Sequence, residues 1–332
     1  MAAPRVSVVI PVRDHPEYLA ESLASVFRQD YERVEIIVVD DGSTEDLSPA
    51  LTPWGDRIRV ERQAPTGVAA ARNRGVAVAT APVIAFHDAD DLMEPIRISA
   101  LMARLESDPS LEVVFGNGIC IDSVGTPLGP VIPPRQARRL VRRGLPLDEL
   151  MRRSVVYLQA SLIRRRVVNE LGGFPPLAAG SDWWFFLRCA LRAPIAYVDA
   201  PLFRYRQHGA SITAGRIRSA EGAVRVLREL ATVEPRLVEH VGRKRWARAL
   251  ARRVARLASQ EARAGNVAAA RRHWGEAARL APTTLKYRWR WLRSSLGSMR
   301  SSLGPMRTSP GSTPTSPGST PTSPGSTRND PG

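Results

Sequence analysis

Residues 6–11 of the chain read VSVVIP, a run of β-branched residues that ends abruptly, and similar segments follow at 38–43 (VVDDGS) and 86–91 (FHDADD). A buried parallel strand is apolar along its length and reaches a ligand crevice at its carboxyl end, which is the pattern seen here. Two of the three strand ends carry carboxylates, and crowded carboxylates repel one another unless a cation or a hydrogen-bonding ligand joins them. The three segments therefore predict a nucleotide and metal site along one edge of a sheet.

Strand and helix patterns alternate around these segments as far as about residue 115. The spacing predicts strands over 5–11, 34–40, 58–60, 83–86 and 112–115, separated by helices near 18–27, after Ser43 or Thr44, and over 67–79 and 93–105. This order indicates an α/β fold with a mostly parallel sheet flanked by helices and right-handed crossovers. Further along, we expect a loop or short basic helix over 123–146, a helix over 182–192, and closing strands over 195–198 and 202–205.

The remainder of the chain differs in character. Residues 216–293 read as Arg-rich helices, and the small residues around Trp274 have the spacing of the second half of a tetratricopeptide-like hairpin, with helix 243–263 as its partner. One such hairpin cannot bury its own apolar face, so it should pack on the preceding α/β domain or on another subunit. The Gly/Ser/Thr/Pro repeats of the tail predict disorder. We therefore expect domains at 1–215 and 216–293 and a disordered tail at 294–332.

Charge is distributed unevenly along the 332 residues, whose formal net charge is +16. Residues 202–332 hold 25 Lys and Arg against 7 Asp and Glu, whereas residues 1–201 hold 23 against 25. Because residues 1–201 are slightly acidic, we do not expect a nucleic-acid partner. Two cysteines exclude a disulfide scaffold, and no apolar run is long enough for a transmembrane helix. With no signal peptide pattern at the start, we expect a cytoplasmic protein.

Six short segments in a fixed order resemble a family 2 glycosyltransferase with the GT-A fold, an inverting family. Besides the three strand ends, they are residues 66–75 (TGVAAARNRG), the segments 171–175 (LGGFP) and 181–188 (SDWWFFLR), and 205–208 (YRQH). The resemblance runs through about residue 213. It implies a nucleotide-sugar donor, UDP-linked by expectation, and a glycan or glycolipid acceptor.

On the donor side, the resemblance assigns roles to the strand-end residues. It implies that Asp90 binds a divalent cation, Mg²⁺ or Mn²⁺, and that Asp88 contacts the ribose or the metal. Asp41 would accept a hydrogen bond from the base or ribose, although a turn carboxylate at 40–43 is the alternative. It further places Pro11 and Arg13 at the base pocket. A cation that bridges both phosphates offsets the charge of the leaving nucleotide, and it prefers such oxygen ligands.

Three more residues complete the expected site. Arg72 would meet a phosphate or a carboxylate of the metal cluster, unless it is a solvated helix arginine. His208 would approach the diphosphate or complete the metal shell, its alternative being a structural role. Asp182 is the expected general base, because inversion needs a carboxylate opposite the leaving group. Its alternative is a helix-cap role. We expect part of the aromatic run 183–185 to stack on a sugar.

Two other functions remain open at this stage. A sugar nucleotidyltransferase usually has a Gly-rich loop after its first strand, which residues 11–16 lack. A non-catalytic interaction protein acting through its basic helical half is disfavoured by the intact acidic residues. The stretch 285–293 (LKYRWRWLR) combines cationic and aromatic side chains, so it predicts peripheral contact with the inner face of a membrane. The alternative is a last helix that packs its tryptophans on the preceding hairpin.

Overall fold

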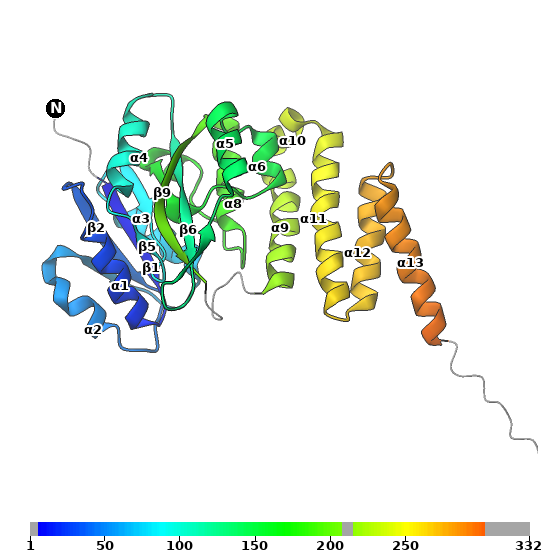
Figure 1. The fold of residues 1–332 in the computed structure, drawn as a ribbon, viewed down its shortest axis with the longest axis horizontal. Helices are drawn as coiled ribbons and strands as arrows, with labels where there is room; N and C mark the ends of the chain where they lie inside the picture. Colours follow the sequence, from blue (N-terminus) through cyan, green and yellow to red (C-terminus); the bar gives the residue numbers. More distant parts are fainter. Residues whose placement is uncertain (1–5, 208–214, 303–332) are drawn as a thin grey trace, which may run out of the picture.

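The computed structural model describes residues 6–207 and 215–302, with side chains described as far as residue 294. His208 therefore lies outside the described residues, as does most of the expected tail. A sheet flanked by helices occupies the first two thirds of the described chain, and a row of helices extends away from it (Figure 1). None of the described helices combines the length and the apolar composition that crossing a membrane requires.

The first half of the sheet is parallel. Its four strands lie in the order β3-β2-β1-β4, with β1 (Val6–Val12), β2 (Val34–Asp40), β3 (Arg59–Arg62) and β4 (Val83–Phe86). Every residue of β1 is buried, because helices cover both faces of the sheet. One face packs on α1 (Pro16–Val26) and α4 (Arg97–Glu106), and the opposite face packs on α3 (Val68–Val78). The strand ends at residues 40 and 86 therefore reach the same edge.

The second half makes the sheet mixed. Strand β8 (Ser161–Arg164) is inserted antiparallel between β4 and β6 (Val113–Ile121), and β9 (Ile195–Arg206) runs parallel to β6. The short strands β5 (Leu92–Met93) and β7 (Pro127–Pro130) add antiparallel pairs. Four helices complete this half: α5 (Pro134–Arg143), α6 (Leu147–Arg152), α7 (Arg165–Glu170) and α8 (Ser181–Arg192). The α/β fold expected from the sequence is confirmed, with antiparallel strands that the sequence pattern did not reveal.

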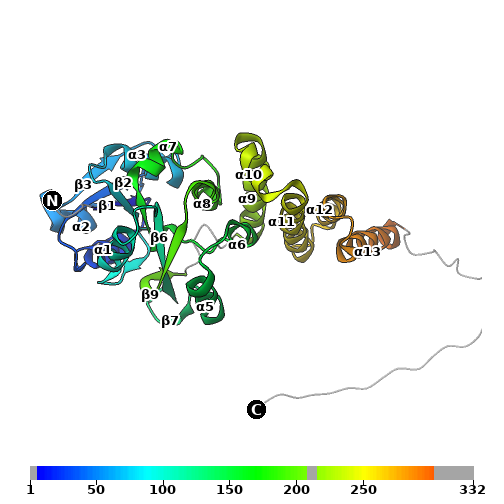
Figure 2. The ribbon, with the colours of Figure 1, turned by 90° about the horizontal axis from the view of Figure 1, so that it is seen from above.

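The helical extension stands in a row beside the sheet (Figures 1 and 2). It comprises α9 (Arg216–Val233), α10 (Pro235–Val241), α11 (Arg243–Arg263), α12 (Val267–Leu280) and α13 (Leu285–Ser302). Apolar residues of α9, α10 and the start of α11 belong to the same core as α8, whereas the rest of α11 packs with α12. The extension is therefore not a separate globular unit, since its first helices complete the apolar core of the α/β half.

The last helix packs Tyr287 and one of its two tryptophans on the preceding helix. The Tyr287 ring lies 6.2 Å from the Trp274 ring of α12. A Cβ built on Gly275 of α12 would lie 3.0 Å from Nε1 of Trp291, so this tryptophan approaches the hairpin closely. Trp289, by contrast, is 56% exposed. Packing on the hairpin is thus observed for one face of α13 and does not include Trp289.

Several local expectations differ from the structure. No helix begins at Ser43, where residues 43–45 form a loop, and the next helical segments are α2 (Ser48–Leu51) and the 3₁₀ helix η1 (Thr52–Arg57). Helix α4 begins at Arg97, because Met93 pairs with β9 as part of β5. Helix α13 continues to Ser302, past the expected start of the tail at residue 294.

Candidate active site

The carboxyl ends of β2, β1 and β4 meet at one edge of the sheet. Pro11 is buried near the end of β1. On one side, the N–H of Asp41 donates to the C=O of Val12 at 2.9 Å, and on the other, the N–H of His87 donates to the C=O of Val9 at 3.0 Å. The two carboxylate-bearing segments therefore flank β1, as the strand order requires in a parallel sheet.

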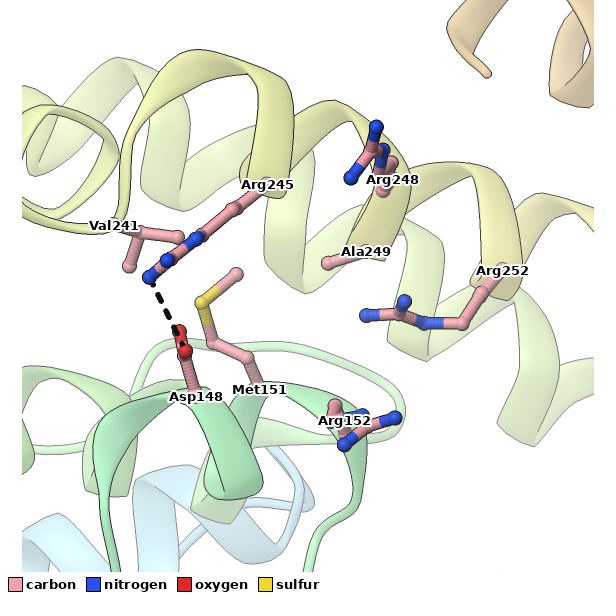
Figure 3. A pocket seen from close by; sticks show the side chains of 8 residues that line it. All are labelled: Asp148, Met151, Arg152, Val241, Arg245, Arg248, Ala249 and Arg252. Carbon is pink, nitrogen blue, oxygen red and sulfur yellow. Dashed lines mark hydrogen bonds and ion pairs between the residues drawn. The ribbon is translucent and has the colours of Figure 1, made fainter. Parts of the chain in front are cut away.

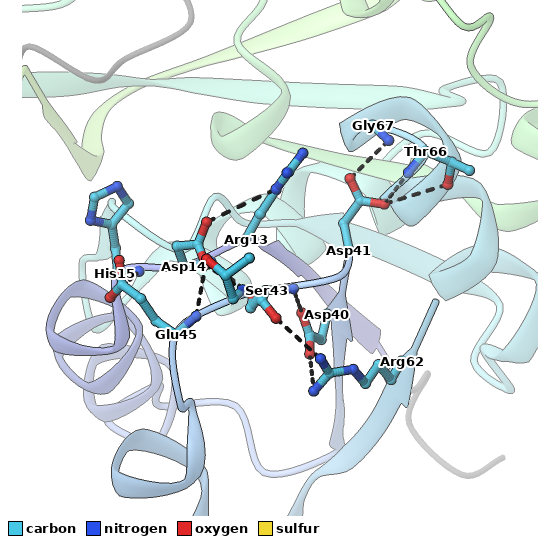
Figure 4. A network of polar contacts seen from close by, with 11 residues as sticks. Arg13, Asp14, His15, Asp40, Asp41, Ser43, Glu45, Arg62, Thr66 and Gly67 are labelled. Atoms are coloured by element: carbon cyan, nitrogen blue, oxygen red, sulfur yellow. Dashed lines mark hydrogen bonds and ion pairs between the residues drawn. The ribbon is translucent and has the colours of Figure 1, made fainter. Parts of the chain in front are cut away.

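Asp41 joins the end of β2 to the loop before α3 (Figure 4). Its carboxylate accepts hydrogen bonds from the N–H groups of Thr66 and Gly67 at 2.9 and 2.8 Å, and from the Gln63 side chain at 2.8 Å. Asp40 makes the local turn instead, accepting from the N–H of Ser43 at 2.7 Å. The turn role that was open for Asp41 is thus filled by Asp40, and Asp41 organises the loop that leads to α3.

In the loop after β1, the sequence reading assigned a role to Arg13 but none to Asp14 or His15. Asp14 and His15 both have positive φ, at 63° and 60°, a conformation that is costly for residues with a Cβ. The Asp14 carboxylate accepts from the N–H groups of Thr44 and Glu45 at 2.7 and 3.1 Å (Figure 4), and these bonds lower the pKa of Asp14. Two loops that border the edge are therefore held together by a strained turn.

Arg72 reaches from α3 to the end of β4. Its guanidinium donates to the Asp88 carboxylate at 2.6 Å, and the arginine side chain is only 10% exposed. The reading of Arg72 as a solvated helix arginine is therefore wrong, because the side chain is buried against a carboxylate. A charge-assisted bond of this length fixes the direction of Asp88 at the edge.

The turn 88–91 rests on a buried arginine that the sequence reading did not use. Arg206, 2% exposed at the end of β9, donates from Nε to the Asp90 carbonyl at 2.9 Å and from Nη1 to the Ser123 carbonyl at 2.9 Å. Its own N–H donates to the buried Asp91 carboxylate at 2.8 Å. The only signal for this residue was its place in the segment 205–208. Arg206 ties β9 to the turn that carries the proposed metal ligand.

Two further buried polar groups lie beneath this turn. Arg97 is fully buried and donates to the Phe86 carbonyl at 2.8 Å, and burial lowers its pKa to about 9. His87 is also fully buried, and burial holds its pKa well below the ordinary value, so the imidazole is neutral. The strand end is thus fixed by side chains on its inner side, while Asp88 and Asp90 remain partly exposed on the outer side.

Asp182 comes to the same edge from the start of α8. It is half-buried and close enough to Arg72 and Asp88 to interact with both electrostatically. Burial raises the pKa of Asp182, the charge of Arg72 opposes this rise, and the charge of Asp88 adds to it. The chain therefore gathers one cation and two carboxylates from β4, α3 and α8, although these residues are up to about 110 positions apart.

The aromatic residues after Asp182 do not form a stacking platform. Trp183, Trp184 and Phe185 are 3%, 8% and 0% exposed, so the expected sugar stacking is wrong for all three. They belong to the apolar core because α8 packs on the sheet with one side and on α6 and α9 with others.

The remaining predicted residues are placed as follows. Arg13, just after Pro11, is 54% exposed and 4.0 Å from the Asp14 carboxylate. His208 lies outside the described residues. The described part of the chain contains no group of three or more His, Cys, Asp or Glu side chains arranged to hold a metal ion. The partly exposed oxygens of Asp88 and Asp90 suit a hard cation that takes its other ligands from substrate phosphates, as Mg²⁺ commonly does.

A family model described as "Glycosyl transferase family 2" matches residues 7–172, the part that carries Asp41, Arg72, Asp88 and Asp90. The chain belongs to glycosyl transferase family 2. A "PGL/p-HBAD biosynthesis glycosyltransferase" of Mycobacterium bovis is 30% identical over 63% of this chain and 79% of its own length. An uncharacterized glycosyltransferase of Nostoc is 31% identical over 62% of this chain. The matched region spans 66% of the length of the Nostoc relative. In a separate match, it spans 38% of the length of GlyG, a glycosyltransferase of Streptococcus pneumoniae.

Solved structures show the fold of this family 2 chain. Residues 1–349 of S. aureus TarS give a TM-score of 0.63 at 15% identity, covering 90% of this chain and 92% of that one. A mannosyltransferase of Pyrobaculum calidifontis, solved with GDP-Man and Mn²⁺, gives 0.53 at 21% identity and covers 92% and 89%. At these identities the likeness extends to the fold, and the coverage includes the helical extension as well as the sheet.

Proposed function

We propose that the chain is an inverting, metal-dependent glycosyltransferase that moves a sugar from a nucleotide-diphosphate donor, UDP-linked by preference, to a hydroxyl of a glycan or glycolipid. The observation that carries this proposal is the meeting of Asp182 with Arg72 and Asp88 at the strand edge of a family 2 domain. Residues 1–215 form the transferase domain in this proposal, and residues 216–293 are its helical extension.

On the donor side, Pro11, Arg13 and Asp41 line the base and ribose pocket, with Asp88 beside the ribose. Asp90 and His208 would hold Mg²⁺ or Mn²⁺, and the cation would offset the negative charge that develops on the leaving nucleoside diphosphate. Asp41 supports this placement through the loop 63–67, since its carboxylate fixes the backbone that borders the pocket. Arg72 neutralises part of the carboxylate charge, so that the edge tolerates a diphosphate.

On the acceptor side, Asp182 takes the proton of the attacking hydroxyl. The new bond forms between that oxygen and the anomeric carbon as the bond from this carbon to the phosphate oxygen breaks, so the configuration inverts. A carboxylate with a raised pKa is the stronger base, and the pKa of Asp182 is raised by burial. The base is ionised above its pKa, so turnover should fall as the pH drops through a value above the ordinary 3.8 of an aspartate.

The experiment starts with donor binding. Thermal shifts with UDP-N-acetylglucosamine, UDP-glucose, UDP-galactose and GDP-mannose, with and without Mn²⁺, identify the donor, because a ligand specific for the folded state raises its melting temperature. With that donor, Asp182→Asn should keep its binding and lower turnover by at least ~10². The acidic limb of the wild-type pH profile should disappear in this variant. Near-wild-type turnover would contradict the assignment and direct the search to Asp122 and Asp148.

The same binding data separate the two alternatives. A sugar nucleotidyltransferase would release diphosphate from a nucleoside triphosphate and a sugar phosphate, which is a distinct product. An interaction protein would show no nucleoside diphosphate release with any acceptor pool, despite tight binding through residues 216–293. Buried Arg72 paired with Asp88 favours the transferase, because a degenerate site has no need of a charged pair held at 2.6 Å.

We further propose that α13 holds the enzyme at the inner face of an anionic membrane. Leu285, Trp289 and Leu292 are 74%, 56% and 54% exposed, and their spacing of four and three places them on one side of the helix. The stretch 285–293 carries four cationic residues and no acidic one. An exposed apolar stripe flanked by arginines matches the composition of interfacial helices.

Vesicle co-sedimentation tests this contact. Binding to phosphatidylglycerol vesicles should weaken with salt and disappear when Arg288, Arg290 and Arg293 are replaced by Glu. Trp289→Ser keeps the charge and removes part of the stripe, so it should weaken binding at every salt concentration. Absence of sedimentation at low salt would refute the membrane contact.

A further inference from the structure

We propose that the helical extension positions the catalytic base, with Arg253 of α11 as the central positioning residue. The proposal rests on Asp182 being the base, as argued above. It concerns the neighbouring residue, Trp183, whose side chain leaves α8 on the side that faces the extension. Helix α8 supplies Asp182 to the reaction. It is held in place by α6, α9 and α11, which supply no residue to the proposed site.

Trp183 is clamped between two elements. Its indole Nε1 donates to the Leu150 carbonyl of α6 at 2.8 Å, and the Arg253 guanidinium of α11 lies 4.3 Å from its ring centroid. Arg253 also donates to the Met151 carbonyl at 3.2 Å, so it bridges the ring and the backbone of α6. Burial lowers the pKa of Arg253 to about 10, which leaves it cationic at neutral pH, and a desolvated cation over an indole is a strong form of this contact.

The turn that precedes α8 is seated on α9. A Cβ built on Gly222 of α9 would lie 2.6 Å from the Ala179 carbonyl oxygen, and one built on Gly180 would lie 3.0 Å from a methyl of Val226. Only a glycine at position 222 allows α9 to approach this closely. Gly180, with φ at 87°, directly precedes the first turn of α8. The start of the helix is therefore fixed from the side of the extension as well.

A third contact holds the middle of the helix. Arg188 of α8 is ion-paired with Glu234, at the junction of α9 and α10, at 3.1 Å. The same guanidinium donates to the Leu171 carbonyl at 2.6 Å and lies 4.5 Å from the Trp184 ring centroid. Because these side chains are mostly buried, this pair is screened less than a surface ion pair.

The junction of α6 and α11 closes the arrangement (Figure 3). Arg245 of α11 lies 3.5 Å from the Asp148 carboxylate of α6, and Met151 lies between the two helices in the same view. Helix α6 is attached to α11 mainly through Arg253, because the Arg245 pair is largely exposed and contributes little. A displacement of α11 would move the carbonyl that receives the Trp183 indole.

The consequence for Asp182 follows from helix geometry. Consecutive residues of an α-helix are about 100° apart around the axis, so a ring fixed at position 183 fixes the direction of the side chain at 182. A base must lie within hydrogen-bond reach of the attacking hydroxyl, and a displacement of about 1 Å can lower a rate by up to ~10². Loosening the clamp should thus affect the chemical step more than donor binding, since the donor residues belong to other elements.

The test compares Arg253→Ala with Arg253→Lys and with Arg256→Ala, a control that removes an exposed arginine from the same helix. The measured reaction is nucleoside diphosphate release from whichever donor of the panel the wild-type protein turns over, with water as the acceptor. In Arg253→Ala we expect kcat to fall about 10-fold and the donor KM to stay within about twofold. Arg253→Lys should restore part of kcat, and Arg256→Ala should match the wild type.

Hydrogen exchange of residues 182–187 supplies a readout that does not depend on activity. Exchange there should be faster in Arg253→Ala, while exchange in β1 and β4 stays unchanged. Wild-type kcat, or a loss of kcat that only follows a smaller folded fraction, would overturn the proposal. If Asp182→Asn keeps full turnover, Asp182 is not the base. Arg253 then has no base to position, even if hydrogen exchange shows that it holds Trp183 in place. If Asp182→Asn is inactive and Arg253→Ala is fully active, only the positioning role fails.

Discussion

The strand edge with Asp41 and Asp88 and the start of α8 with Asp182 border one site, but they are held differently. The edge is fixed by a parallel ladder and by hydrogen bonds such as that from Gly67 to Asp41, within one stretch of about ninety residues. Helix α8 is fixed by α6, which precedes it, and by α9 and α11, which follow it. The strand edge is thus built mostly from neighbouring segments, with Arg206 of β9 as the distant exception. The start of α8 depends on helices that lie on both sides of it in the chain.

The largest expected effect is a loss of UDP affinity on substitution at the strand edge. Asp90→Ala removes a proposed metal ligand at a partly exposed strand end, so UDP affinity in Mn²⁺ should fall by at least ~10² without loss of the fold. Titration calorimetry with UDP and MnCl₂ measures this, with melting temperature as the check on folding. Asp56→Ala, which removes an exposed carboxylate of η1, is the control and should bind as the wild type does. Unchanged UDP affinity in Asp90→Ala would refute the assignment.

The second effect concerns the contact of β9 with the strand edge. Arg206→Met removes two hydrogen bonds to carbonyls and an ion pair with Glu21 at 2.6 Å, from a side chain that is 2% exposed. Because hydrogen bonds of a charged donor are worth more than neutral ones, the free energy of unfolding should fall by roughly 2–3 kcal/mol, and UDP affinity should fall with it. Urea denaturation and UDP titration measure the two quantities.

The same strand offers the matched control. Arg204 is 43% exposed and is paired with Glu94 at 2.7 Å, a surface pair worth little. Arg204→Met should change the free energy of unfolding by less than about 1 kcal/mol. Equal losses of unfolding free energy in both variants would mean that the contacts of Arg206 with the turn 88–91 contribute no more than a surface ion pair.

A smaller effect is expected on the acceptor side alone. Gly222→Ala places a methyl group against the Ala179 carbonyl, so α9 must shift, which should cost about 1–3 kcal/mol of stability. Turnover should fall while UDP affinity is kept, because α9 packs mainly on α8, α10 and α11. Glu221→Ala on the exposed side of α9 is the control. A loss of UDP affinity in Gly222→Ala would show that the two regions are not independent.

The smallest effect should come from Arg13. Its side chain is 54% exposed and 4.0 Å from a carboxylate, so Arg13→Ala should leave the free energy of unfolding within about 0.5 kcal/mol of the wild type. The quantity to measure is the ratio of UDP to GDP affinity. A changed ratio with unchanged stability would place Arg13 at the base pocket, and an unchanged ratio would remove it from there.

The same contrast explains what the sequence could predict. Asp41 and Asp88 were assigned to one edge because parallel strands end together, and this needs only the strand pattern. The helix predicted at Ser43 is absent, since the N–H groups and the hydroxyl there bond to Asp14 and its backbone, about thirty residues earlier. Strand β8 was missed because four residues with no flanking turn signal do not show a strand period.

Contacts between distant segments account for the rest. Nothing in the sequence around Gly222 or Arg253 distinguishes them from the many other glycines and arginines of the chain, and Arg206 was marked only by its place in the segment 205–208. Their importance comes from the backbone carbonyls and the ring that they meet, and those partners lie about 40 to 120 residues away. The aromatic run 183–185 was misread for the same reason, because its partners in the core come from α6 and α9.

The row α9, α11, α12 and α13 also acts as a spacer. Each helix packs on the next (Figure 1), and packed helices lie about 8–10 Å apart, so the exposed stripe of α13 stands roughly 25–30 Å from α9. If α13 lies on a bilayer, the active site is held at this distance from the membrane unless the whole protein lies flat on it. An acceptor anchored in that bilayer must then be long enough to span the distance. The length of the lipid-linked chain that the enzyme accepts would then be measured by the extension, and shortening the row by one helix would shift that length.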